Sequence, residues 1–238
     1  MAKILNIETS TNVCSVALSE NGKLIDYKES QEDKSHSSLL TVFIDEMLKQ
    51  NNIQASQLDA VAVSKGPGSY TGLRIGVSVA KGICYAVDKP AIGVSTLQLM
   101  ALGVVNSNKF NSLNIDDIKK AWFCPMIDAR RMEIYSAFFD FENKQKVKVS
   151  ADIIDENSYK ELLDKRKILF FGDGANKCKD IINHKNAFFI DDVYPSAKNM
   201  IALSHQAFLD KKFEDTAYFE PFYLKDFVAT VSKKNIFK

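Results

Sequence analysis

The feature that most constrains the fold of this 238-residue chain is an internal duplication. Alternating apolar residues predict strands and wider apolar faces predict helices, in the order βββαβαβα, and this order occurs twice. The first strands of the two units end in Ile7-Glu8 and Ile127-Asp128, and the second strands, near Cys14 and Ile134, keep the same offset of 120 residues. A repeat of this size predicts two similarly folded halves.

The expected elements divide the chain into four parts. In the first half the strands and helices fall at residues 4–8, 14–19, 23–29, 35–50 and 58–64, then after the glycine-rich loop to about 87, at 90–95 and from 96 onward. In the second half they fall at 121–128, 133–140, 146–150, 158–165, 167–171, after 174, at 187–190 and at 196–212. We therefore predict a first domain over 1–104, a polar linker over 105–120, a second domain over 121–212, and a tail over 213–238 that packs back on the body.

A duplicated βββαβαβα unit is typical of the actin-like superfamily of α/β proteins, which includes sugar kinases and heat-shock ATPases. Each half there is a ribonuclease-H-like domain, and ligands bind in the cleft between the halves. Fold and function are separate inferences, so the residues around that cleft must be judged on their own chemistry.

Composition excludes several classes of function. The net charge of +1 predicts no strong overall attraction to nucleic acid or acidic membranes, although a local basic patch remains compatible with it. The four cysteines form no Cys-x-x-Cys pair, which argues against a zinc or redox motif, and Cys14 and Cys84 fit buried small residues. No apolar run suits a signal peptide or a membrane span, so we expect a cytoplasmic protein.

The glycine-rich junction at residues 65–72 ends a strand and begins a helix. It can cradle an anion at the helix N-terminus, yet it matches neither the Walker loop nor Gly-x-Gly-x-x-Gly. Its helix carries small residues at Gly72, Gly76, Ala80 and Cys84, with Ser78 and Gly82 on a second stripe. Two such stripes predict close packing on two sides, either wholly inside the domain or with one side against a second chain.

Three further segments carry candidate polar sites. Glu8, Thr9 and Ser10 follow the first strand, where the superfamily binds nucleotide phosphates, but a tight hairpin is the favoured interpretation. Asp173 is a second weak nucleotide candidate, and it equally fits a helix cap. The charged hairpin 128–133 can bind an anion or a partner, but a solvated turn is favoured. The tail alternates aromatic and basic residues through 221–226 and then carries Lys233-Lys234, so it can contact RNA or a partner, but docking on the protein's own surface is favoured.

Several of these segments together resemble the TsaB (YeaZ) family, over nearly the whole chain and most specifically in the first half. The matching runs are Ile7 to Thr11, Ser15 to Leu18, His36-Ser37, Gly66 to Gly76, Gly93 to Leu97, Asp128 to Arg130 and Pro221 to Lys225. The resemblance implies a role in bacterial synthesis of threonylcarbamoyladenosine beside the tRNA anticodon. It also implies a non-catalytic subunit that pairs through its N-terminal half with the catalytic relative TsaD, together with TsaE, and meets tRNA indirectly.

Departures from the TsaD pattern support a non-catalytic role for this protein. TsaD-type proteins carry His-Leu-Glu-Gly-His where this chain has residues 96–100, so Thr96 and Met100 replace both metal-ligating histidines. A hydroxyl and a thioether do not hold a divalent metal there. Asn12 stands where TsaD has an aspartate, and Glu8 alone makes a poor phosphoryl-handling site. We expect no metal and no cofactor, with ATP or ADP at the joint with TsaD left open.

The predicted partner interface combines two helices. One is the helix expected at residues 35–50, and the other follows the glycine-rich junction. Its residues are His36, Leu39, Leu40, Phe43, Met47, Tyr70, Gly72, Arg74, Gly76, Val77, Ala80, Lys81 and Cys84. The same helices predict a homodimer when TsaD is absent. The alternative is an enzyme acting alone, either an actin-like ATPase or a glycoprotease-type metallopeptidase using Glu8, Asp128 and Asp173.

Overall fold

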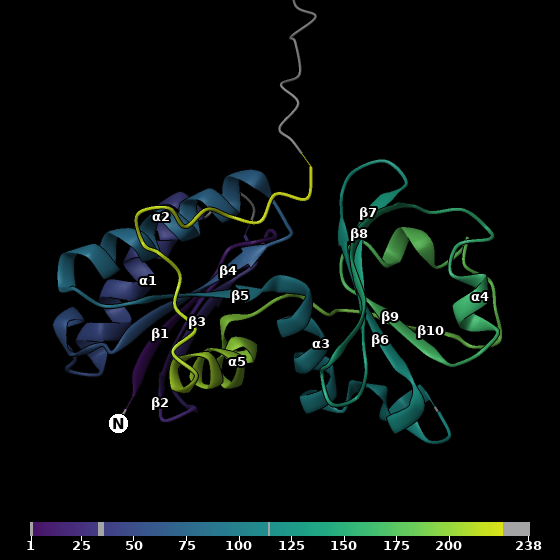
Figure 1. The fold of residues 1–238 in the computed structure, drawn as a ribbon, viewed down its shortest axis with the longest axis horizontal. Helices are drawn as coiled ribbons and strands as arrows, with labels where there is room; N and C mark the ends of the chain where they lie inside the picture. Colours follow the sequence, from purple (N-terminus) through teal and green to yellow (C-terminus); the bar gives the residue numbers. More distant parts are fainter. Residues whose placement is uncertain (1, 33–35, 114, 226–238) are drawn as a thin grey trace, which may run out of the picture.

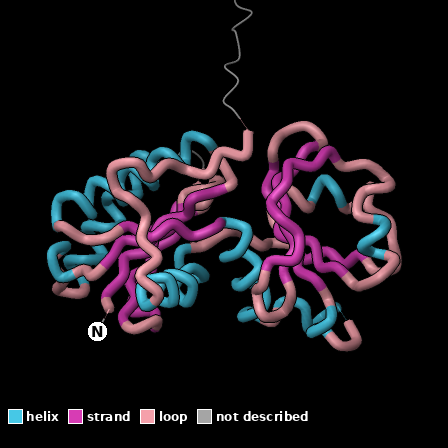
Figure 2. The backbone as a smooth tube through the Cα atoms, viewed as in Figure 1, coloured by secondary structure: helices cyan, strands magenta, loops and turns pink. Residues whose placement is uncertain are grey.

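The computed structural model describes residues 2–32, 36–113 and 115–225. Ten strands form two five-stranded sheets, one in each half of the chain (Figures 1 and 2). The strand orders are β3-β2-β1-β4-β5 and β10-β9-β6-β7-β8, which are the same order once the second set is renumbered from its first strand. The predicted α/β fold class, an actin-like duplication of two ribonuclease-H-like units, is confirmed.

In the first half, three antiparallel strands are followed by two parallel ones. The elements are β1 (Lys3–Glu8), β2 (Cys14–Glu20), β3 (Lys23–Ser30), α1 (His36–Gln50), β4 (Ala60–Gly66), α2 (Tyr70–Val87), β5 (Ala91–Ser95) and α3 (Thr96–Ser107). Strand β1 pairs with β2 antiparallel and with β4 parallel, so the carboxyl ends of β1, β4 and β5 meet at one edge of the sheet.

The second half repeats the strands, but its first two helices are reduced to single turns. Its elements are β6 (Trp122–Asp128), β7 (Glu133–Phe139), β8 (Gln145–Ile153), α4 (Lys160–Leu163), β9 (Ile168–Phe171), β10 (Ala187–Ile190) and α5 (Ala197–Leu209). Of the predicted helix 158–165 only the single turn of α4 forms, because Tyr159 at its start has a left-handed φ of 63°.

The predicted helix after residue 174 is wrong. The segment contains only the 3-10 turn η4 (Asn176–Cys178). The Gly174 N–H donates to the Met126 carbonyl at 3.1 Å, which ties the start of the segment to β6. The predicted linker is partly helical as well: α3 continues to Ser107, and the short turns η2 (Lys109–Leu113) and η3 (Ile118–Lys120) follow it.

Two helices cross between the halves. α3 packs against β6 and β7 of the second sheet, whereas α5, from the end of the second half, packs against β1, β2, β3 and β5 of the first sheet (Figure 1). The range 121–212 predicted for a second domain therefore includes a helix that covers the first sheet. Buried polar groups fix this crossing, since the Ser204 hydroxyl donates to Asn6 Oδ1 at 2.6 Å and the Ala197 N–H donates to Ser15 Oγ at 2.9 Å.

The core follows from this crossing. One cluster joins both sheets through α3 and includes Ile4 and Ile92 from the first sheet and Phe123 and Leu169 from the second. A second cluster lies between the first sheet and α1 and α2, and a third lies on the outer face of the second sheet. α1 and α2 thus form the outer layer of the first half, with the tail running beside α2 (Figure 1).

Candidate functional site

The loop after β1 and the glycine-rich junction after β4 lie against each other. They meet because β1 and β4 are parallel neighbours whose carboxyl ends share one edge of the sheet. The Ser69 N–H donates to the Ser10 carbonyl at 2.6 Å, and the Thr9 hydroxyl donates to the Gly72 carbonyl at 2.8 Å. The first turn of α2 is therefore fastened to the loop by hydrogen bonds in both directions.

The glycines of this junction are required by that contact. A Cβ built on Gly72 would lie 2.0 Å from the Thr9 carbonyl oxygen, and one on Gly68 would lie 2.3 Å from the Ser10 carbonyl oxygen. One turn further along α2, a Cβ on Gly76 would lie 2.3 Å from Thr9 Oγ1. The stripe of small residues thus lets α2 approach the chain's own backbone, which is the intradomain alternative left open by the sequence.

Three of the weak nucleotide candidates are inaccessible. Glu8, Thr9 and Ser10 all have 0 % exposed side chains. Burial raises the pKa of the Glu8 carboxyl to about 7, although hydrogen bonding from Ser10 opposes this shift, including the Ser10 N–H donated to Oε1 at 2.6 Å. Its Oε2 has no hydrogen-bond partner among the described residues. The carboxyl can hold a proton near neutral pH, but in this conformation none of these three side chains is presented to a phosphate.

Asp173, the fourth weak candidate, fastens the second half at the equivalent place. It follows β9, and its Oδ1 accepts the Asp128 N–H at 3.0 Å, so it ties the end of β6 and caps no α-helix. Burial and the charge of Asp128 raise the pKa of Asp173. The hydrogen bonds found for the described residues do not connect Asp173 to Glu8, so the acids predicted to flank one cleft are not brought together by any bond.

The two positions that replace metal-ligating histidines serve the core. Thr96 is 0 % exposed and Met100 is 1 % exposed, and both lie on the buried side of α3. The Met100 methyl carbon lies 2.8 Å from where a Gly172 Cβ would be, so the thioether fills the space between α3 and the start of the segment after β9. Within the described ranges, no group of three or more His, Cys, Asp or Glu side chains can hold a metal ion. These residues do not fit the metal of the TsaD pattern.

Seven residues of the predicted partner interface point into the chain itself. Each belongs to the buried face of α1 or α2, and their side chains or backbone pack on the first sheet: Leu40, Met47, Gly72, Gly76, Val77, Ala80 and Cys84. The prediction that they contact a partner is corrected, because the apolar faces from which they were inferred are the faces that close the domain's own core.

The tail covers one flank of α2. Lys81 donates to the carbonyls of Ala217 and Phe219, both at 3.1 Å. The Tyr70 ring lies 4.9 Å from the ring of Tyr223, and the Arg74 guanidinium lies 4.9 Å from the Tyr70 ring centre. The predicted interface residues Tyr70, Arg74 and Lys81 are therefore neighbours of the tail.

The outer surface of α1 and α2, away from the tail, remains open. We call this surface the α1–α2 face. It holds two of the predicted residues, Leu39 and Phe43, and His36 at the start of α1, whose ring nitrogen lies 3.1 Å from the Val13 carbonyl. The prediction missed Val42 on α1 and three partly buried apolar residues of α2, although the spacing of four between these three was visible: Ile75, Val79 and Ile83. Gly82 lies at its edge with open space around it.

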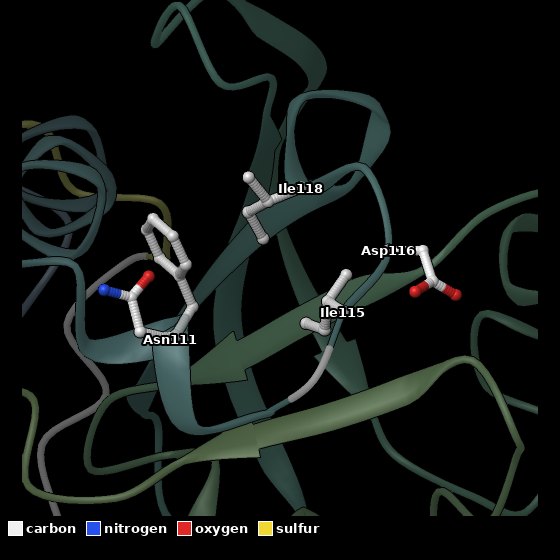
Figure 3. Close-up of a pocket in the computed structure, with 5 residues that line it drawn as sticks. Asn111, Ile115, Asp116 and Ile118 are labelled. Carbon is white, nitrogen blue, oxygen red and sulfur yellow. The ribbon is translucent and has the colours of Figure 1, made fainter.

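Hollows elsewhere in the structure come from segments that the prediction left without a role. One hollow, of about 290 Å³, lies in the expected linker (Figure 3). It is lined by Phe110, Asn111, Ile115, Asp116 and Ile118. Beside it, a hollow of about 650 Å³ holds Trp122 with the Arg166 guanidinium 3.7 Å from its ring centre. Three of the five lysines around it are paired with carboxylates, as in Lys146 with Asp140 at 2.6 Å. No described helix is long and apolar enough to cross a membrane.

Comparison with known proteins places this geometry in a family. The family model described as TsaD, tRNA N6-adenosine threonylcarbamoyltransferase, matches residues 28–233. The protein named tRNA threonylcarbamoyladenosine biosynthesis protein TsaB from Haemophilus influenzae is 27% identical over 241 residues, covering 94% of this chain and 93% of its own length. The protein of the same name from Escherichia coli is 27% identical over 236 residues, covering 95% and 96%.

A solved structure supports the fold. YeaZ from Pseudomonas aeruginosa superposes with a TM-score of 0.77 at 23% sequence identity, covering 94% of this chain and 100% of that one. At this identity the likeness concerns the fold alone.

The contact between α2 and the loop after β1 predicts opposite effects for two glycines on one helix. Gly72→Ala should lower the free energy of unfolding by about 3 kcal/mol or more, because its Cβ meets a backbone oxygen that cannot move aside. Gly82→Ala should raise it by up to about 1 kcal/mol, because no atom lies within 4 Å and alanine favours the helix. Denaturant unfolding of both variants measures the difference; equal effects would contradict the close approach.

The buried Glu8 carboxyl predicts a pH dependence of stability. Below pH 4.5 the group is protonated in both states, whereas between 4.5 and about 7 it ionises only in the unfolded chain, so stability falls as pH rises through this window. The loss amounts to about 3 kcal/mol by pH 8. Glu8→Gln should remove it while retaining the bond from Ser10.

Unfolding of wild type and Glu8→Gln across this pH range measures that loss, with the exposed Glu46→Gln as control. If Glu8→Gln keeps the wild-type pH dependence, the buried carboxyl is not its source.

Proposed function

Since the chain belongs to the TsaD family, in its TsaB (YeaZ) branch, we propose that it takes part in synthesis of tRNA threonylcarbamoyladenosine as a non-catalytic subunit. The observation that carries this proposal is the burial of the two positions where the TsaD pattern places metal-ligating histidines. Thr96 and Met100 are core residues here, and neither side chain offers a donor that suits a divalent metal. Its place of work is the cytoplasm, where a tRNA substrate would be met.

A non-catalytic subunit acts by binding, and the α1–α2 face is the surface that suits this part. Its apolar side chains are only partly buried by the chain itself, and Val42 remains 44% exposed. Partly exposed apolar side chains gathered on one helical surface are typical of protein interfaces. We infer that the face docks on a TsaD-type catalytic subunit, with TsaE joining the assembly, and that two copies pair through it when that subunit is absent.

The nucleotide contact left open by the sequence belongs to the same proposal. Because Glu8, Thr9 and Ser10 are closed off by α2, ATP or ADP would have to bind at the joint with the catalytic subunit, using groups of both chains. This chain then acts by shaping the joint and carries no residue that turns substrate over.

The docking surface can be tested without disturbing the core. Gly82→Trp places a large ring in open space at the edge of the α1–α2 face, so it should leave the melting temperature unchanged and weaken pairing with a TsaD-type subunit at least tenfold. Ala202→Trp, on the exposed face of α5, is the matched control and should pair normally. Size-exclusion chromatography and calorimetry of the mixtures measure pairing.

Normal pairing by a folded Gly82→Trp variant would place the interface elsewhere. Ala80→Trp is unsuitable for this test, because Ala80 is 0 % exposed and a ring there would break the packing of α2 on the sheet.

The function itself predicts a change in tRNA. Depletion of this protein in its source cell should cause loss of threonylcarbamoyladenosine from tRNA, measured by mass spectrometry of nucleosides. Re-expression of the wild-type chain should restore the modified base, and Gly82→Trp should restore less of it than Ala202→Trp. Unchanged levels of the modified base after depletion would remove the proposed function.

A further inference from the structure

The hairpin between β6 and β7 holds two consecutive arginines in an unfavourable backbone conformation. Arg130 has a φ of 71° and Arg131 a φ of 50°, both in the left-handed region that favours glycine or asparagine. Each such residue costs free energy, and such outliers persist where the surrounding structure holds them. Both arginines are exposed, so the conformation serves no core packing.

The hairpin is held rigidly from below. The Lys177 ammonium donates to the carbonyls of Arg131 and Glu133, each at 2.7 Å, and to Asp128 Oδ1 at 2.5 Å. The same Asp128 oxygen accepts the Arg130 N–H at 2.8 Å. These bonds hold the backbone of the tip, and both arginines are exposed.

The positive charge of the tip is not neutralised. The two carboxylates nearest to it in the chain are already engaged, Asp128 with Lys177 and Glu133 with Lys225 of the tail. Among the described residues, neither guanidinium forms an ion pair, a cation–π contact or a side-chain hydrogen bond. The hairpin therefore presents two unpaired positive charges to solvent from a backbone that is held in place.

The ion pair between Lys225 and Glu133 brings the tail of the chain to this hairpin, across the junction of the two halves (Figure 1). Two residues earlier in the tail, Tyr223 packs on Tyr70, and Arg74 lies over Tyr70 in turn. The Phe222 N–H donates to the Lys65 carbonyl at 2.6 Å, which fixes this part of the tail on the first half. We call the resulting surface the aromatic–basic strip: Arg74, Tyr70, Tyr223, Lys225, Arg131 and Arg130.

We propose that the aromatic–basic strip binds single-stranded RNA. Cationic groups that follow a sugar-phosphate backbone, interleaved with aromatic rings on which bases stack, are the combination that single-stranded nucleic acid requires. An acidic peptide would use the charges but not the rings. The hollow at Trp122 is the weaker candidate, because the Arg166 guanidinium already covers the Trp122 ring at 3.7 Å. Three of its five lysines are also paired with carboxylates: Lys120, Lys146 and Lys167.

The strip gives the proposed subunit direct contact with an RNA strand and to that extent rests on the proposed function. Its recognition is not base-specific, since stacking and phosphate contacts tolerate any sequence. The binding energy is expected to depend on salt, because each phosphate neutralised by an arginine releases a counterion.

Substitution at the strained arginines separates this role from a structural one. The double variant Arg130→Ala, Arg131→Gly removes both charges and relieves the left-handed strain at 131, so its melting temperature should stay the same or rise. Its affinity for a short fluorescein-labelled single-stranded RNA should fall at least about tenfold, and the slope of log affinity against log salt should decrease by about 1 to 2. Tyr223→Leu should weaken binding with no change of that slope.

Lys211→Gly is the matched control. Lys211 is likewise exposed with a left-handed φ of 55°, but it lies after α5, away from the strip. The control loses a charge and the same backbone strain, so it should keep wild-type RNA affinity. Affinity lost equally in Lys211→Gly and the double variant, or retained in the double variant, would overturn the proposal. Tighter binding of a labelled poly-glutamate peptide than of RNA would overturn it as well.

The full-length chain, alone and mixed with the catalytic subunit, distinguishes this inference from the proposed function. If the double variant pairs normally with the catalytic subunit and loses RNA, both stand. If the wild-type chain pairs normally and fails to bind RNA, the strip proposal alone fails. If it binds RNA through the strip but does not pair, the proposed function fails and the strip proposal stands.

Discussion

The contact between Thr9 and the first two turns of α2 is the constraint on which the rest of the first half depends. Because Gly72 and Gly76 lack a side chain, α2 lies directly on the loop after β1 and receives a hydrogen bond from the Thr9 hydroxyl. This fixes the rotation of α2 about its axis. The rotation in turn decides which residues enter the core, which flank meets the tail, and which flank stays open beside α1.

The two flanks of α2 therefore differ in what they contact. On one, Lys81 and Tyr70 hold the tail, which carries Tyr223 and Lys225 toward the second half. On the other, apolar side chains are left partly covered, as suits a protein partner. A single helix thereby separates a surface for association from a surface built of cations and aromatic rings, and neither proposal requires the other's residues.

The strands, their order and the fold class could be predicted from the sequence, because the duplicated apolar pattern repeats at a constant offset and each strand is bounded by turn residues. What a stripe of small residues packs against could not be predicted in the same way. Gly72, Gly76 and Ala80 give the same pattern whether they meet the chain's own loop or a second chain, and only the position of Thr9 distinguishes the two. Likewise, nothing in Arg130-Arg131 as a sequence indicates a left-handed backbone, which arises from the clamp at Lys177.

The crossing of α5 onto the first sheet has a consequence for synthesis of the chain. The strands of that sheet all lie before residue 96, yet the helix that covers their inner face is α5, the last helix in the part of the chain that the structure describes, and its Ser204 donates to Asn6. During translation from the N-terminus, the first sheet leaves the ribosome long before its cover does. Until residues 197–209 emerge, this face of the sheet is exposed and accessible to chaperones. The first sheet to be synthesised therefore completes its packing only when α5 has been made.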